Sequence, residues 1–110
     1  MSNHALLQIA YAREESIDVD QHDERIYGIL KECGYGRETL NNLRDAFEDG
    51  ETELGGGAQG LLEVIEQIAR LAPAVTFYAR AMGEEFRDTW VREFEGGKPV
   101  FAAGPWEYED

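Results

Sequence analysis

Carboxylates are the side chains whose number and spacing could do chemistry in this chain. The sequence has 23 acidic residues against 10 lysines and arginines, a formal net charge of −13. Many of them fall in residues 14–24 and 45–53, and neither segment contains a lysine or arginine. Clustered carboxylates attract basic proteins and speed their association. We therefore expect a partner-binding surface made of Glu14, Glu15, Asp18, Asp20, Asp23, Glu24, Asp45, Glu48, Asp49, Glu51 and Glu53.

A metal site is not predicted from these residues. Residues 18–24 resemble the start of a calcium-binding loop, but the sixth position is Asp23 where glycine is needed, and the twelfth is Ile29 where glutamate is needed. Acidic residues at the start of a helix explain the same pattern, because the helix dipole favours negative charge there. His4 and His22 are far apart and have no third ligand at a useful spacing. We expect no metal and no cofactor.

Nucleophilic and phosphate-binding sites are also not indicated. Ser2 and Ser16 are the only serines, and neither lies in a glycine-flanked nucleophile turn. Cys33 falls on the apolar face of a predicted helix and is expected to be a buried structural thiol. The glycine-rich residues 55–60 precede a predicted helix, as a phosphate-binding loop would, but no strand is predicted before them and no lysine follows. A flexible loop is predicted over residues 51–60.

A different pattern near the C-terminus raises the question of acid–base chemistry. Carboxylates can act as acid and base where burial separates their pKa values. Asp88 and Arg92 fall on one face of a predicted strand together with Trp90, and we interpret them as a structural ion pair across strands. Trp90 and Trp106 are expected in the core or at its edge. The alternative is a ligand-binding or catalytic pocket, between the helices and the sheet, formed by Glu85, Asp88, Trp90 and Arg92.

The charge balance limits the classes of partner. Binding of nucleic acid phosphates requires lysine or arginine patches, so direct binding of nucleic acid or of an anionic membrane is not expected. The apolar run after the N-terminus is too short for a membrane span or a signal peptide. A single cysteine gives no intramolecular disulfide, which favours a cytoplasmic location. Solubility alone also explains a high acidity, but the clustering favours a basic protein partner.

The last third of the chain predicts a three-stranded meander. Residues 75–82 alternate between apolar and polar, and the pattern restarts over residues 86–94 after Gly83. Gly96 and Gly97 are typical of a two-residue hairpin turn, because glycine readily adopts positive φ. Residues 100–102 form the third predicted strand, and Pro99 before them places it at an edge.

Three helices and one ambiguous segment precede this meander. Apolar residues recur at helical spacing from Asp20 to Gly34, from residue 37 to 47, and from residue 58 to 72. Residues 5–12 alternate as in a strand, although their alanines and leucines also fit a helix; we favour a fourth strand at one edge of the sheet. The inward-facing residues of the three helices are expected to be Ile26, Leu30, Cys33, Leu40, Leu43, Ala46, Phe47, Leu61, Ile65, Ile68 and Ala72.

Together these elements predict an α+β two-layer domain, with three helices packed on one side of a small antiparallel sheet. At 110 residues with 43% apolar content, the chain is expected to form a single domain over residues 1–110. Residues 104–110 are expected to be a frayed acidic tail.

In size, acidity and lack of a catalytic motif, the chain resembles in kind the small inhibitor proteins that bacteria and their phages use to block toxins or nucleases. This resemblance assigns no role to any residue. It implies a non-enzymatic inhibitor, an immunity protein against a bacterial toxin nuclease, with a basic protein as its partner. Three alternatives stay open: a phage-encoded nucleic-acid mimic that blocks a defence complex, a small ligand-binding or enzymatic domain, and an assembly module whose acidity serves only solubility.

Overall fold

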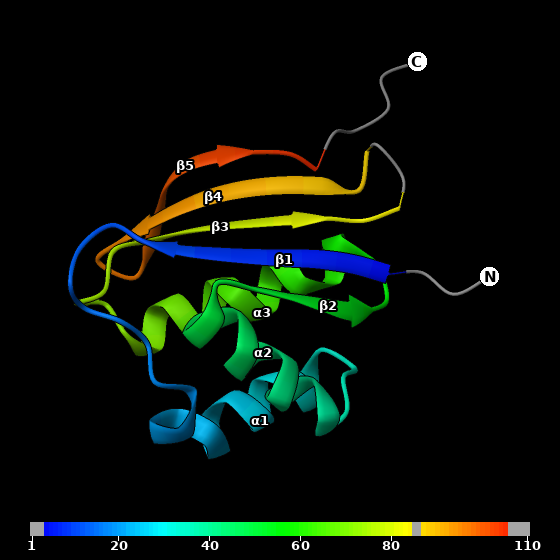
Figure 1. Cartoon of the computed structure of the whole chain (residues 1–110), viewed down its shortest axis with the longest axis horizontal. Coiled ribbons are helices and arrows are strands. Elements are labelled where there is room, and N and C mark those ends of the chain that lie inside the picture. Colours follow the sequence, from blue (N-terminus) through cyan, green and yellow to red (C-terminus); the bar gives the residue numbers. More distant parts are fainter. Residues whose placement is uncertain (1–3, 85–86, 106–110) are drawn as a thin grey trace.

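The computed structural model describes residues 4–84 and 87–105, which form an antiparallel sheet covered by helices on one face (Figure 1). The strands are hydrogen-bonded in the order β2-β1-β3-β4-β5. This arrangement confirms the predicted α+β two-layer fold. The elements in chain order are β1 (His4–Tyr11), the short 3-10 helix η1 (Val19–His22), α1 (Asp23–Glu32), α2 (Glu38–Asp49), β2 (Glu51–Gly55), α3 (Ala58–Leu71), β3 (Phe77–Met82), β4 (Thr89–Glu95) and β5 (Lys98–Ala103).

The predicted meander is present as β3, β4 and β5. Phe77, Ala79 and Ala81 are buried beneath the helices, whereas Tyr78 and Arg80 alternate onto the helix-free face. The turn between β4 and β5 is formed by Gly96 and Gly97, with φ of 63° and 80°. Both positive angles are those of the primed turn that matches the twist of a hairpin.

The segment that was ambiguous in sequence is strand β1, but it is not an edge. It pairs with β3 on one side and with β2 on the other, so it lies inside the sheet. The predicted flexible loop over residues 51–60 is therefore wrong in its first half. Leu54, 2% exposed, is the one buried residue of β2, and it pairs with Ala5. Backbone pairing with β1 makes this polar segment a strand, which local propensity did not indicate.

The helices follow the predicted spacing, but the first α-helix starts at Asp23, later than the predicted start at Asp20. Asp18 caps the 3-10 helix η1, because its carboxylate accepts a hydrogen bond from the Asp20 amide at 3.0 Å. The chain then forms η1 before α1 begins. Gly34 and Gly50 follow α1 and α2 with φ of 86° and 100°, as expected for glycines that end helices.

Aromatic side chains form the centre of the core between the two layers. Phe77 stacks on Phe94 with ring centroids 5.0 Å apart, and it meets Phe47 of α2 edge-on at 5.8 Å. Trp90 is fully buried, as predicted, and its indole Nε1 donates to the Ala58 carbonyl at 2.6 Å. Cys33 is only partly buried at the end of α1, and burial is the main cause that raises the pKa of its thiol. The contacts of Phe47 and Trp90 attach α2 and α3 to the sheet.

Candidate functional site

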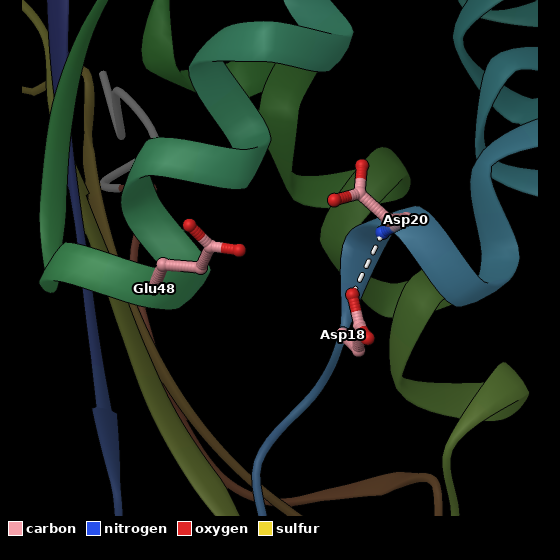
Figure 2. Close-up of side chains that lie close together, drawn as sticks. All are labelled: Asp18, Asp20 and Glu48. Atoms are coloured by element: carbon pink, nitrogen blue, oxygen red, sulfur yellow. Dashed lines mark hydrogen bonds between the residues drawn. The ribbon is translucent and has the colours of Figure 1, made fainter.

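The two acidic segments of the sequence meet where η1 lies beside α2 (Figure 2). Asp18 and Asp20 come from the first segment, and Glu48 comes from the second. Each offers a carboxylate oxygen that lies within 4.8 Å of the other two, and all three side chains are exposed. We call Asp18, Asp20 and Glu48 the acidic cluster.

Burial of alternate residues presents the first two carboxylates to solvent. Ile17 and Val19 are 3% and 0% exposed, so the chain is anchored in the core on both sides of Asp18. Asp18 lies between these two buried residues and Asp20 follows the second one, and both aspartate side chains point outward. Their position therefore follows from core packing, not from a pairing between carboxylates, which repel each other.

Tyr11 joins the two segments that carry the cluster. Its hydroxyl donates to the Phe47 carbonyl at 2.6 Å and accepts from the Ile17 amide at 3.1 Å. Burial raises the pKa of the Tyr11 phenol, the hydrogen bond with Ile17 acts in the opposite direction, and the negative charge of Glu48 adds to the rise. One half-buried side chain thus fixes the end of α2 relative to the segment that leads into η1.

Arg44 supplies a positive charge at the edge of the acidic cluster. Its Nη2 and Nε each lie 2.7 Å from Oδ1 of Asp20, and its Nη1 donates to Asn41 at 2.7 Å. One guanidinium does not neutralise three carboxylates, so the cluster stays negative. The acidic cluster can bind cationic groups. An ion that coordinates Oδ1 of Asp20 would have to compete with Arg44 for that oxygen.

The other predicted carboxylates are exposed too, but the structure spreads them over several surfaces. Glu51 and Glu53 pair with Gln8 and Leu6 of β1, and directly paired residues share a face of the sheet. They therefore lie on the helix-free face, where Gln8 donates to Glu51 at 3.3 Å. The remaining carboxylates are Glu14 and Glu15 after β1, Asp23 and Glu24 in the first turn of α1, and Asp45 and Asp49 on α2.

The predicted ion pair between Asp88 and Arg92 is wrong. Asp88 lies before β4, and its two carboxylate oxygens accept from the backbone amides of Ala58 and Gln59 at 2.7 and 2.9 Å. The Arg92 Nη1 instead donates to the carbonyls of Val91 and Ala103 at 2.9 and 3.1 Å. Asp88 and Arg92, two of the four residues of the suggested pocket, thus have structural partners, and a third, Trp90, is fully buried.

Glu85 from the same pocket hypothesis, Trp106, and most of the predicted acidic tail lie outside the described residues. The role of Asp88 as the cap of α3 was missed because 30 residues separate it from Ala58. No local sequence signal marks this role. That Gly57 and Gly83 leave room for the Asp88 carboxylate is visible only in the structure, where a Cβ atom on either glycine would crowd it.

The start of α3 also revises the argument about phosphate binding. Strand β2 does precede the glycine-rich residues, so the strand–glycine–helix order of a phosphate-binding loop is present. The Asp88 carboxylate, however, already occupies the amides of Ala58 and Gln59, where an anion would bind. This helix N-terminus therefore has an internal anion.

In residues 4–84 and 87–105, no helix combines the length and the apolar character needed to cross a membrane. No protein-family model matches the chain, and no curated protein or solved structure is significantly similar to it. The features of this chain that bear on function are therefore its own residues, above all the acidic cluster and the exposed carboxylates of α2.

Proposed function

We propose that this chain is an acidic inhibitor protein that binds a basic partner, as an immunity protein occupies the substrate cleft of a toxin nuclease in the cytoplasm. The observation that carries the proposal is the meeting of Asp18, Asp20 and Glu48, whose carboxylate oxygens lie within 4.8 Å of one another on an exposed surface. Clefts that bind phosphates are lined by lysine and arginine. Closely spaced carboxylates are complementary to such a cleft.

The mechanism is occlusion, with carboxylates in the positions that phosphates would take. An arginine of the partner can form a two-pronged, charge-assisted pair with Glu48, which has no hydrogen bond or ion pair to a neighbouring side chain among the described residues. Asp45 and Asp49, one turn apart on α2, extend the negative surface beyond the cluster. The net charge of −13 attracts a basic partner from a distance and raises the rate of association.

A triple charge reversal on α2 tests this proposal. We expect Asp45→Lys, Glu48→Lys and Asp49→Lys together to weaken binding by about 100-fold or more, because each replaces an attraction with a repulsion at a cationic cleft. The partner is captured from source cells with the tagged wild-type chain, and its affinity is then measured by calorimetry. Circular dichroism checks that the variant remains folded.

The control has the same charge change elsewhere. Glu32→Lys, Glu63→Lys and Glu95→Lys alter exposed residues of α1, α3 and β4 that belong to neither acidic segment. If the acidic cluster is the binding surface, this control loses less than about tenfold in affinity, an effect of net charge alone. Equal losses in both variants, or unchanged binding of the α2 variant, would show that this surface does not bind the partner.

A further inference from the structure

A hollow of about 420 Å³ lies between helices α1 and α3. Ile29 of α1 and Leu71 of α3 provide apolar parts of its lining. Positions 25, 28, 29 and 32 line it from α1, and this spacing places them on one face of the helix. The volume is within the range of small-ligand sites in proteins. We call this feature the α1–α3 hollow.

The α1–α3 hollow has a positive end and a negative end. Tyr35 follows α1, and a Cβ atom on Gly60, near the start of α3, would lie 2.7 Å from its hydroxyl oxygen. The end of α1 is therefore beside the start of α3, and the two helices run antiparallel. Arg25 at the start of α1 and Arg70 at the end of α3 share one end of the hollow, and Glu32 lies at the other.

The stability of α1 does not account for the residues that line the hollow. Arg25 is in the first turn of α1 and Glu32 is its last residue, so each has the charge that the helix dipole disfavours at its position. Gly28 is a poor helix former in the middle of α1, and a Cβ atom on it would meet nothing within 4 Å. Locally unfavourable residues of this kind are expected at functional sites.

The charged groups of the hollow are available to a ligand. Within residues 4–84 and 87–105, the side chains of Arg25, Arg70 and Glu32 form no hydrogen bond or ion pair. A carboxylate can bind the two guanidinium groups through charge-assisted hydrogen bonds, and an ammonium group can bind Glu32. A ligand with both groups has no net charge, so the −13 of the chain does not repel it as it repels a simple anion.

The length and polarity of the hollow narrow this ligand further. Arg25 and Glu32 are seven positions apart on α1, which corresponds to about 10 Å along the helix axis. An extended peptide covers about the same distance in three residues. Gln67 of α3 also lines the hollow, and its side-chain amide can both donate to and accept from a peptide group. A peptide therefore fits better than an apolar chain with one charge at each end.

We propose that the α1–α3 hollow binds a short peptide of about three residues with free termini and an apolar middle residue. Its carboxylate binds Arg25 and Arg70, its ammonium group binds Glu32, and its apolar side chain lies over Gly28. This site is separate from the proposed function, because the acidic cluster is formed by η1 and α2. Either proposal can fail without the other.

Titration of the isotope-labelled full chain with the tripeptide Ala-Leu-Ala, followed by NMR at pH 7, tests this proposal. The backbone amides of α1 and of the end of α3 are expected to shift, with a Kd below about 1 mM. Acetylation of the peptide N-terminus and amidation of its C-terminus are each expected to weaken binding by about fivefold or more, because each removes a charged hydrogen-bonding group.

Matched variants assign each charge. In Glu32→Gln, acetylation of the peptide should cause no further loss of affinity, and Arg25→Gln combined with Arg70→Gln should do the same for amidation. Gly28→Leu should fill the hollow and block binding with an equal or higher melting temperature, because leucine favours helix and its Cβ has room. Arg80→Gln removes a positive charge from the helix-free face and should leave the Kd unchanged.

Three results would overturn the proposal. The first is that the amides around the hollow do not shift at about 5 mM peptide. The second is that a peptide capped at both ends binds as tightly as the free one, because the charged ends would then not hold it. The third is that Gly28→Leu binds like the wild type, which would place the peptide elsewhere on the chain.

Discussion

At the scale of single residues, Tyr11 has the most consequences for the candidate site. Its hydroxyl contacts the backbone of both Ile17 and Phe47, so it holds together the two segments that carry the acidic cluster. A phenol can donate and accept at the same time, which no other apolar-bodied side chain of this size does. The predicted alternation of residues 5–12 identified Tyr11 as a strand residue, but its partners lie outside the strand and were not predictable from spacing.

Tyr11→Phe should destabilise the fold by about 1–2 kcal/mol at neutral pH, because the Phe47 carbonyl and the Ile17 amide lose a partner. The variant should also flatten the loss of stability at alkaline pH. The folded state raises the pKa of Tyr11 above 10.0, so its contribution is complete below pH 10 and is lost as pH rises through the folded value. Urea unfolding between pH 7 and about 11 measures both effects.

The exposed Tyr78 provides the control for this comparison, since Tyr78→Phe removes an equivalent hydroxyl from the helix-free face. Tyr35→Phe should behave like Tyr11→Phe at high pH, because burial is also the main cause that raises the pKa of Tyr35. An alkaline unfolding profile that is identical in wild type and Tyr11→Phe would show that Tyr11 ionises normally in the fold.

At the scale of elements, the N-terminal cap of α3 is Asp88, which lies in the connection between β3 and β4. Gly57 precedes the helix and has no side chain with which to cap it. Asp88 supplies the missing acceptors to Ala58 and Gln59, and its charge is favourable at the positive end of the helix dipole. The same short region holds Trp90 against the Ala58 carbonyl. The start of α3 is thus attached to the start of β4 at two points.

Asp88→Ala should lower the free energy of unfolding by about 2 kcal/mol, because two helix amides lose a charged acceptor. Asp88→Asn retains one acceptor oxygen without the charge, and about half of that loss is expected. Urea denaturation at pH 7 measures the series, with Asp45→Ala on the exposed face of α2 as the comparison for removal of a carboxylate. If Asp88→Ala leaves the unfolding midpoint unchanged, Asp88 does not cap α3 in solution.

Elements with a strong internal period were predictable, and elements defined by distant partners were not. The buried faces of α2 and α3 repeat at helical spacing, and Phe77, Ala79 and Ala81 alternate in β3, so local sequence specifies them. Strand β2 has one buried residue, Leu54, and exists through its pairing with β1. The same limit applies to the site. The sequence showed two acidic segments, but only the placement of η1 beside α2 brings their carboxylates together.

At the scale of the whole molecule, charge and apolar surface are separated. The acidic cluster lies beside α2, which packs on edge strand β2, and the exposed apolar side chains Val100 and Phe101 lie on the opposite edge strand β5.

Glu48→Gln should raise the free energy of unfolding by about 0.5–1 kcal/mol at low salt, because Glu48 repels Asp18 and Asp20 and lies in the last turn of α2, where the dipole disfavours negative charge. Arg44, one turn earlier on α2, pairs with Asp20, so it offsets only part of this repulsion. The gain should shrink in about 0.5 M NaCl, and the pKa of Tyr11 should fall, since Glu48 helps to raise it. Urea and phenolate titrations test this, with Asp45→Asn as control. A carboxylate that destabilises the free chain while strengthening its complex has a binding role, whereas a loss of stability in Glu48→Gln would assign it a structural one.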